Sequence, residues 1–546
     1  MLQHNGRRDP RVRDYLLPTR IVWSTNDESG PHNTERLLSP DPNIGTCVME
    51  FKSAEAPGML LDFGRELHGG IKITNFITPV QAPVKVRVRF GESVSEAMGT
   101  PNNDHAIHNI LCEIPWYGST EIGNTGFRFV RIDLVEPGSR LDLVKVEAVF
   151  LYRDLPYLGR FECSDPLLNT IWNTGAYTVH LCMQEHVWDG IKRDRLVWIG
   201  DMHPETMVIN TVFGHVDVVP DSLDWVRDKT PLPGWMNGIS SYSLWWIIIQ
   251  QCWYFYHADK DYLAQQREYL MGLLKQLHAC IGPDHSEKLE GHRFLDWPSS
   301  EDPAAIHAGL HSLLIIAFRA AADLCYALEE PQGQNECLAA ANSLQLHTPA
   351  RTASKQASAL MALAGVADTK EINADILAAG QYSGISTFYG YYVLQARAEA
   401  GDYQGCLDVI RHYWGTMLKL GATTFWEDFN LDWTRNCGTI DAITPDGKKD
   451  IHADFGDYCY VGLRHSLCHG WAAGPTAWMS EHVLGIKPLA PGFESVLVKP
   501  NLGDLQWAKG ALPTPHGLIT VSHTRHADGS VMSEVTAPEG IRVTRA

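Results

Sequence analysis

The sequence lacks several features that would assign it to a common class of protein. Its 12 cysteines form no C-x-x-C pair and no spacing typical of metal ligands, which argues against a zinc framework. No apolar segment of the kind found in a secretory leader follows the first residues, and no run approaches a membrane span. We therefore expect a cytoplasmic protein with no membrane partner. The net charge of −19 argues against nucleic acid as a partner.

A chain of 546 residues is too long for one compact core, and its pattern of apolar and polar residues predicts three domains. We expect an N-terminal β-sandwich over residues 1–157, because residues 84–90 alternate apolar and basic side chains as a half-buried strand does. Similar strands are expected at 127–135 and 143–152. A C-terminal β domain, 488–546, is so short that it needs the preceding domain or a partner to bury its face.

Between the β domains, residues 158–487 predict a helical domain. Apolar side chains recur at helical spacing after Asp165 and Pro166, a pair typical of an N-cap followed by proline at the first helical position. About ten to twelve helices fit this length, which favours a ring of paired helices around a central cleft. The clearest expected helices are 165–184, 243–258, 260–280, 308–330 and 403–418.

A polar motif interrupts the apolar pattern at VWDGIKRDRLVWIGD, residues 187–201. It combines acids, arginines and a tryptophan with side chains that look buried. Burying such groups is costly unless they are paired, which favours a polar pocket. We predict a carbohydrate site, because carboxylates and arginines bind hydroxyls and a tryptophan covers the apolar face of a sugar ring. A salt-bridged junction without a ligand is the structural alternative.

Three further motifs could complete such a site. GATTFWEDF brings Trp426 and Glu427 after a tight bend, and glycoside hydrolysis needs a second carboxyl. FLDWPSSEDP contains Trp297, which could line a sugar pocket, and RHSLCHGWAAGP contains His469, which could bind a hydroxyl. Each motif also fits a structural role, as a turn or as a core histidine.

A metal centre is not expected. His307 and His311 stand four residues apart on an expected helix, a spacing that can bind zinc. No H-E-x-x-H motif, third ligand or calcium loop accompanies them, so we expect no metal and no other cofactor.

Together the motifs resemble bacterial α-L-rhamnosidases of glycoside hydrolase family 78, in one of their shorter forms. The resemblance rests on DGIKRDRLVWIGD, ISSYSLWW, GATTFWEDF and SLCHGWAAGP, which follow the family's order, and on the tail after Pro488. It implies an (α/α)6 barrel between β domains. It also implies an inverting, exo-acting hydrolase that removes terminal rhamnose from an oligosaccharide or small glycoside.

The resemblance implies Asp194 as general acid and Glu427 as general base. Many members have Arg-Asp-Glu-Arg where this chain has Arg193-Asp194-Arg195, with Glu as the acid, so Asp189 and Asp201 remain alternatives. The side chains expected to contact the sugar are Asp189, Arg193, Trp198, Asp201, Trp297 and His469, with Trp426 as a further candidate for the apolar wall beside the rhamnose methyl group.

Two other functions stay open at this point. A sugar-binding protein on the same scaffold could have lost its acid at the shortened motif. A polysaccharide lyase would need a base beside cationic groups that neutralise a uronate. The presence of both Asp194 and Glu427 favours hydrolysis, and the acidic net charge disfavours a uronate substrate. The composition is compatible with a homodimer.

Overall fold

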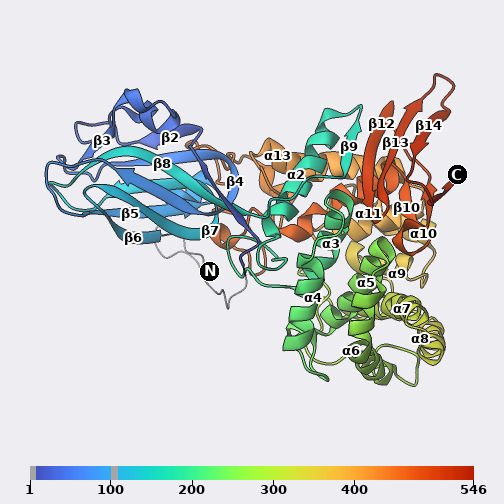
Figure 1. Cartoon of the computed structure of the whole chain (residues 1–546). Helices are drawn as coiled ribbons and strands as arrows, with labels where there is room; N and C mark the ends of the chain where they lie inside the picture. Colours follow the sequence, from blue (N-terminus) through green and yellow to red (C-terminus); the bar gives the residue numbers. More distant parts are fainter. Residues whose placement is uncertain (1–7, 100–108) are drawn as a thin grey trace, which may run out of the picture.

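The computed structural model describes residues 8–99 and 109–546. A β domain lies at one end of an elongated molecule, a helical domain follows, and a small sheet near the C-terminus packs on the far side of the helices (Figure 1). The expected fold class, a helical domain between two β domains, is confirmed. The stretch in which we sought a leader lies partly outside the described residues.

The N-terminal β domain is one antiparallel sheet whose long strands bend into two layers (Figure 1). Its central order is β1-β8-β4-β7-β5-β6, with β2 added to β4 and β3 to β8. The register of β4 against β7 shifts between Asp62 and Leu67, around Gly64, which has a φ of 84°. The strands are β1 (Val12–Leu16), β2 (Arg20–Ser24), β3 (Cys47–Glu50), β4 (Gly58–Asn75), β5 (Val84–Gly91), β6 (Asn109–Ile114), β7 (Gly118–Leu134) and β8 (Arg140–Tyr152), with the short helix α1 (Val94–Met98) after β5.

The helical domain begins with α2 (Pro166–Cys182), whose N-cap Asp165 accepts a hydrogen bond from the backbone of Leu167. The expected helices at 243–258, 260–280 and 308–330 are present with slightly different ends, and the last expected helix is interrupted by a π-helical turn, Ile410–Trp414. The other helices are α3 (Ile199–Val212), α4 (Val218–Lys229), α5 (Ser240–His257), α6 (Lys260–Ala279), α7 (Pro303–Ala327), α8 (Pro331–Leu344), α9 (Lys355–Leu363), α10 (Thr369–Ile372), α11 (Gly390–Glu399), α12 (Tyr403–Val409), α13 (Gly415–Lys419) and α14 (Gly474–Trp478).

Helix α7 corrects one expectation from the sequence. It is long and apolar enough to cross a membrane, with a mean hydropathy of 1.5 over its best window. However, 72% of that window is buried inside the protein. The apolar composition of α7 is therefore that of a core helix, packed against α5, α8 and α9.

The C-terminal sheets depend on the helical domain, as their small size predicts. Strand β9 (Arg160–Cys163), which precedes the first helix of that domain, pairs with β12 and completes a four-stranded sheet of order β14-β13-β12-β9. Ile519 and Val521 join the hydrophobic core of the helices. The remaining strands are β10 (Ile486–Pro488), β11 (Ser495–Val498), β12 (Trp507–Thr514), β13 (Gly517–Arg525), β14 (Val531–Thr536) and β15 (Arg542–Arg545).

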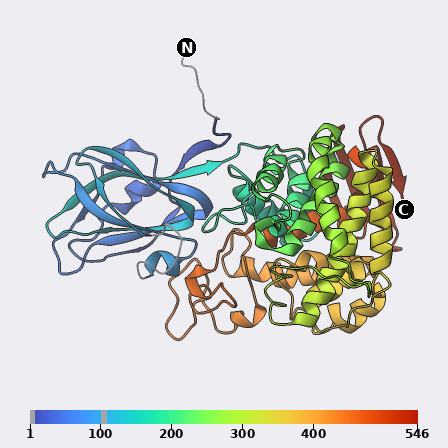
Figure 2. The same ribbon diagram turned by 90° about the horizontal axis from the view of Figure 1, so that it is seen from below.

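The N-terminal β domain and the helical domain share part of a core. Leu181, Ile191 and Cys468 of the helical domain pack into the hydrophobic cluster of the β domain. A long segment after α13 also runs beside helix α1 of the β domain (Figure 2), where the Val94 amide donates to the Ile440 carbonyl at 2.8 Å. The loops that carry the polar motifs are therefore held by contacts with both the N-terminal β domain and the helical domain.

Candidate active site

A cavity of about 360 Å³ opens in the helical domain where the polar motifs converge. Its volume lies within the range of small-molecule sites, and its wall combines carboxylates and arginines with aromatic rings. Eight of the nine candidate residues line it: Asp189, Arg193, Asp194, Trp198, Asp201, Trp297, Glu427 and His469. The structure therefore brings together residues that lie as far as 280 positions apart in the sequence.

Trp426 is the candidate that the structure does not place in this cavity. Its side chain is 1% exposed and packs edge-on against Phe429 and His465, so it supports the segment behind the site. The next residue, Glu427, does line the cavity. The structure therefore gives no support to a contact between Trp426 and a sugar in this cavity.

The first motif forms a loop between α2 and α3 that is closed at its base. The Asp189 amide donates to the Leu196 carbonyl at 3.1 Å, and the Leu196 amide donates to the Asp189 carboxylate at 3.0 Å. At the tip, Asp194 and Arg195 both have left-handed backbones, with φ values of 54° and 56°. Two consecutive non-glycine residues in this region carry strain, and such strain is found preferentially at functional sites.

Arg193 is the centre of the charged side of the cavity. Its Nη2 donates to both oxygens of Glu427, at 2.6 and 2.5 Å, and its Nη1 lies 3.3 Å from Oδ2 of Asp194. The Glu427 side chain is 3% exposed, whereas that of Asp194 is 37% exposed. One guanidinium thus stands between a buried carboxylate and one that reaches solvent.

His469 connects two carboxylates on the opposite side. Its Nε2 lies 3.0 Å from Oδ1 of Asp201, and its Nδ1 lies 3.6 Å from Glu427. The Tyr242 hydroxyl donates to the other oxygen of Asp201 at 3.2 Å. Burial opposes the charged imidazole, but the Glu427 charge and the Asp201 hydrogen bond outweigh it and raise the pKa of His469.

Aromatic rings form much of the wall, and four of them, Tyr242, Phe294, Tyr460 and Trp471, were not among the candidate residues. Trp297 packs against Phe294 at 5.2 Å and stacks on Tyr458 at 6.2 Å between ring centroids. Tyr242 belongs to a segment noticed only through the family resemblance, and Trp471 follows His469 in a motif already singled out. The rings lining the cavity are Trp198, Tyr242, Phe294, Trp297, Tyr460 and Trp471.

Asp296, beside Trp297, yields a pH-dependent prediction. Burial raises the pKa of Asp296 to about 7, although its hydrogen bonds with Ser299 and Ser386 act in the opposite direction. A carboxyl whose pKa is raised on folding costs stability as pH rises from its unfolded value to its folded value. The variant Asp296→Asn should therefore gain stability over the wild type between pH 4 and 7, with a constant difference above pH 7.

The size of this gain should be on the order of a few kcal/mol, because one pKa unit corresponds to about 1.4 kcal/mol. Denaturant unfolding of both proteins at pH 4.5, 6 and 7.5 measures the difference at each pH. Every other titrating group is common to both proteins, so its contribution cancels in the difference between their free energies of unfolding. A difference that stays the same across this range would show that Asp296 is ionised in the folded protein.

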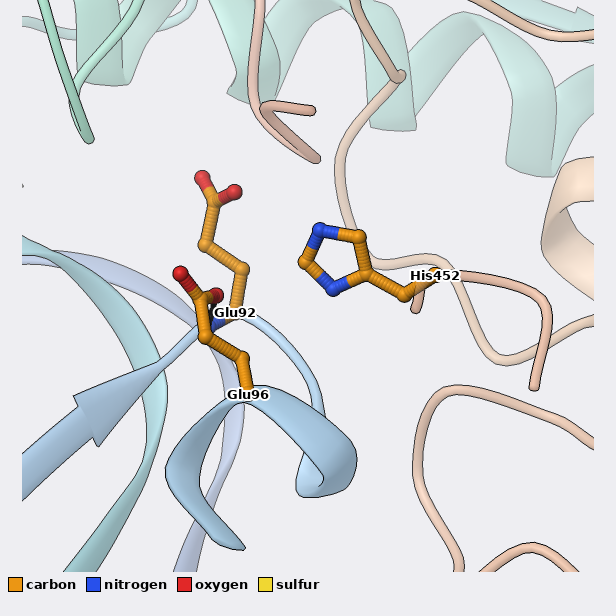
Figure 3. A group of neighbouring side chains, drawn as sticks. All are labelled: Glu92, Glu96 and His452. Atoms are coloured by element: carbon orange, nitrogen blue, oxygen red, sulfur yellow. Dashed lines mark hydrogen bonds between the residues drawn. The ribbon is translucent and has the colours of Figure 1, made fainter. Parts of the chain in front are cut away.

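One group of three potential metal ligands occurs within residues 8–99 and 109–546, and it lies outside the cavity. Ligand atoms of Glu92, Glu96 and His452 lie within 4.8 Å of one another (Figure 3). The ammonium of Lys192, however, lies 2.9 Å from Glu96 and 3.5 Å from Glu92. A lysine therefore supplies the positive charge that these carboxylates need. His307 bonds Glu287 and His347 instead of joining a group of three.

Comparison with family models identifies two segments of the chain. Residues 156–315 match the bacterial α-L-rhamnosidase six-hairpin glycosidase domain, and residues 485–544 match the bacterial α-L-rhamnosidase C-terminal domain. An α-L-rhamnosidase of an Alteromonas species (strain LOR) is 32% identical over 129 residues, which are 23% of this chain and 12% of that protein. The curated relatives are thus much longer than the stretch they share with this chain.

Solved structures share the fold at low sequence identity. The family 78 rhamnosidase of Bacillus sp. GL1 has a TM-score of 0.78 and 22% identity, over 94% of this chain and 55% of that one. The rhamnosidase of Klebsiella oxytoca, solved with rhamnose bound, has a TM-score of 0.65 and 18% identity, over 87% of this chain and 96% of that one. The two matched segments are therefore similar to domains of bacterial α-L-rhamnosidases, and the chain shares its fold with solved rhamnosidases of glycoside hydrolase family 78.

Proposed function

We propose that the protein hydrolyses terminal α-L-rhamnosides with inversion of the anomeric centre, Glu427 acting as general base and Asp194 as general acid. The observation that carries this proposal is the guanidinium of Arg193, which contacts Glu427 through one nitrogen and Asp194 through the other. Inverting enzymes keep their two carboxyl groups roughly 6.5–9.5 Å apart to leave room for water. A guanidinium between the two carboxylates is a spacer of suitable size.

The surroundings of Glu427 suit a base that must be held in one orientation. Besides Arg193, the backbone amide of Ser466 donates to its Oε2 at 3.1 Å. Its own backbone is fixed as well, because the Trp471 indole donates to the Glu427 carbonyl at 2.8 Å. A carboxylate with fixed position and charged partners can orient and deprotonate one water molecule without reorganising.

Asp194 suits the acid because it is the most accessible carboxylate of its motif. Asp201 is bound to His469 and Tyr242, and Asp189 is bound to the Leu196 amide. Burial raises the pKa of Asp189 well above its ordinary range, yet that side chain is enclosed. Asp194 alone among the three reaches solvent at the mouth of the cavity, where a glycosidic oxygen would lie.

The lining of the cavity supports rhamnose as the sugar. Rhamnose is a 6-deoxy sugar, and rings such as Trp198 and Phe294 offer its methyl group an apolar contact. The carboxylates and His469 offer acceptors and donors for its hydroxyls. A cavity of about 360 Å³ has room for a terminal rhamnose residue, which supports exo action.

The direct test compares p-nitrophenyl α-L-rhamnoside with the corresponding α-L-fucoside and β-D-glucoside. We expect hydrolysis of the rhamnoside and at least about 100-fold lower kcat/KM for the other two, because their hydroxyl patterns leave buried polar groups unpaired. Rhamnose that binds in calorimetry without any turnover of the rhamnoside would favour the sugar-binding alternative. Faster turnover of another glycoside would overturn the assignment of the sugar.

A further inference from the structure

The group formed by Glu92, Glu96, His452 and Lys192 lies where the β domain meets the loops of the active site. Glu92 and Glu96 extend from the β domain toward His452, which comes from the segment after α13 (Figure 3). Both ring nitrogens of His452 are already bonded, Nδ1 to the Ser93 hydroxyl at 2.7 Å and Nε2 to the His465 carbonyl at 2.8 Å. A metal ion would have to displace these bonds and Lys192 together.

Lys192 and Glu92 both form hydrogen bonds with the same short loop, residues 463–467. The Lys192 ammonium donates to the carbonyls of Leu463 and His465, at 2.6 and 2.7 Å. Glu92 accepts from the Leu467 amide at 2.6 Å and from the Ser466 hydroxyl at 3.3 Å. Glu92 and Lys192 are almost fully buried, so these hydrogen bonds compete little with water. Burial raises the pKa of Glu92 to about 7, although the charge of Lys192 acts in the opposite direction.

This loop is one of the supports of Glu427. Ser466 donates its amide to Oε2 of Glu427, and Glu427 donates its own amide to the Ser466 carbonyl at 3.0 Å. A further support is Arg193, the neighbour of Lys192. The Nε of Arg193 donates to the Arg464 carbonyl at 3.0 Å. Two groups donate hydrogen bonds to the Glu427 carboxylate. Ser466 is itself bonded to Glu92, and Arg193 is the neighbour of Lys192, which pairs with Glu92 and Glu96.

We propose that Glu92 of the N-terminal β domain is a positioning residue for the reaction, holding the 463–467 loop and Lys192 so that Glu427 keeps its place. This inference rests on the proposed role of Glu427. Packing supports it, because Ile191 and Cys468, beside the two contact points, belong to the core of the β domain. The β domain is in this view part of the catalytic machinery and not only an attached module.

The test compares Glu92→Gln with Asp133→Asn. Asp133 is a suitable control because it is a buried carboxylate of the same domain, paired with Arg89 and Arg131, and its hydrogen bonds and ion pairs stay within that domain. For Glu92→Gln we expect kcat on p-nitrophenyl α-L-rhamnoside to fall roughly 10- to 100-fold with KM within about threefold, as for a displaced catalytic group. Asp133→Asn should keep kcat within about twofold.

Hydrogen exchange of the full-length proteins supplies a readout that does not depend on turnover. Peptides that cover residues 463–469 should exchange faster in Glu92→Gln than in Asp133→Asn. Equal exchange in the two variants, or equal kcat, would overturn the positioning role. If the wild type does not hydrolyse rhamnosides, the proposed function fails, and the exchange comparison still decides whether Glu92 holds the loop. Should Glu92→Gln not fold, Glu92→Asp, which keeps the charge but shortens the reach, serves the same comparison.

Discussion

Replacing Glu427 by Gln is expected to lower kcat on rhamnosides by at least about 10³-fold, because the amide cannot take a proton from the attacking water. The side chain keeps its shape, so rhamnose should still bind with an affinity within about tenfold of the wild type. Steady-state kinetics and calorimetry with rhamnose measure the two effects separately. With p-nitrophenyl α-L-rhamnoside as substrate, this is the largest change that we expect from any single substitution.

The neighbouring carboxylate provides a matched control for that experiment. Asp428 follows Glu427 directly but does not line the sugar cavity, and it lies against a separate pocket beside Tyr458. Asp428→Asn should leave kcat within about threefold. Near-normal turnover in Glu427→Gln would exclude it as the base, and an equal loss in both variants would point to damage of the segment instead of lost chemistry.

Replacing Asp194 by Asn should produce an effect that depends on the leaving group. A p-nitrophenolate leaves with little protonation, so its rhamnoside should lose roughly tenfold or less in kcat/KM. An alkyl rhamnoside needs a proton on its glycosidic oxygen and should lose about 10²–10⁴-fold, the usual contribution of a general acid. Kinetics of the variant with both substrates measure this ratio.

The variant Asp201→Asn serves as the comparison for Asp194→Asn, because Asp201 is buried and binds His469. Its loss should be similar for both leaving groups. If instead Asp201→Asn shows the leaving-group dependence and Asp194→Asn does not, the proton donor is Asp201. The side chain of Asp194 is one methylene shorter than the glutamate that the family resemblance implies as acid, which makes this comparison informative.

Local patterns were sufficient to predict the elements that carry the site. The alternation in residues 84–90 corresponds to strand β5, and the Asp165–Pro166 pair marks the start of α2 as predicted. The charged motif at 187–201 was identified because buried charges are rare without a use. These signals reside in a few neighbouring residues, which is why the sequence alone reveals them.

Contacts between distant segments were beyond such patterns. Tyr242 and Trp471 reach the cavity only because α5 and the loop before α14 pack against the first motif. The direction of Trp426 depends on how its segment pairs with residues 466–469, as in the bond from the His469 amide to the Phe425 carbonyl. Glu92 lies 335 positions from Glu427 and in another domain, and nothing around it in the sequence indicates a link to the site.

Proton NMR of the sugar released from a rhamnoside tests the central claim most directly, because it reports both the sugar and the stereochemistry before the anomers equilibrate. With Glu427 activating water opposite Asp194, the first product should be β-L-rhamnose. Appearance of α-L-rhamnose first would mean retention through a covalent intermediate, and the assignment of Glu427 as a base acting on water would be wrong.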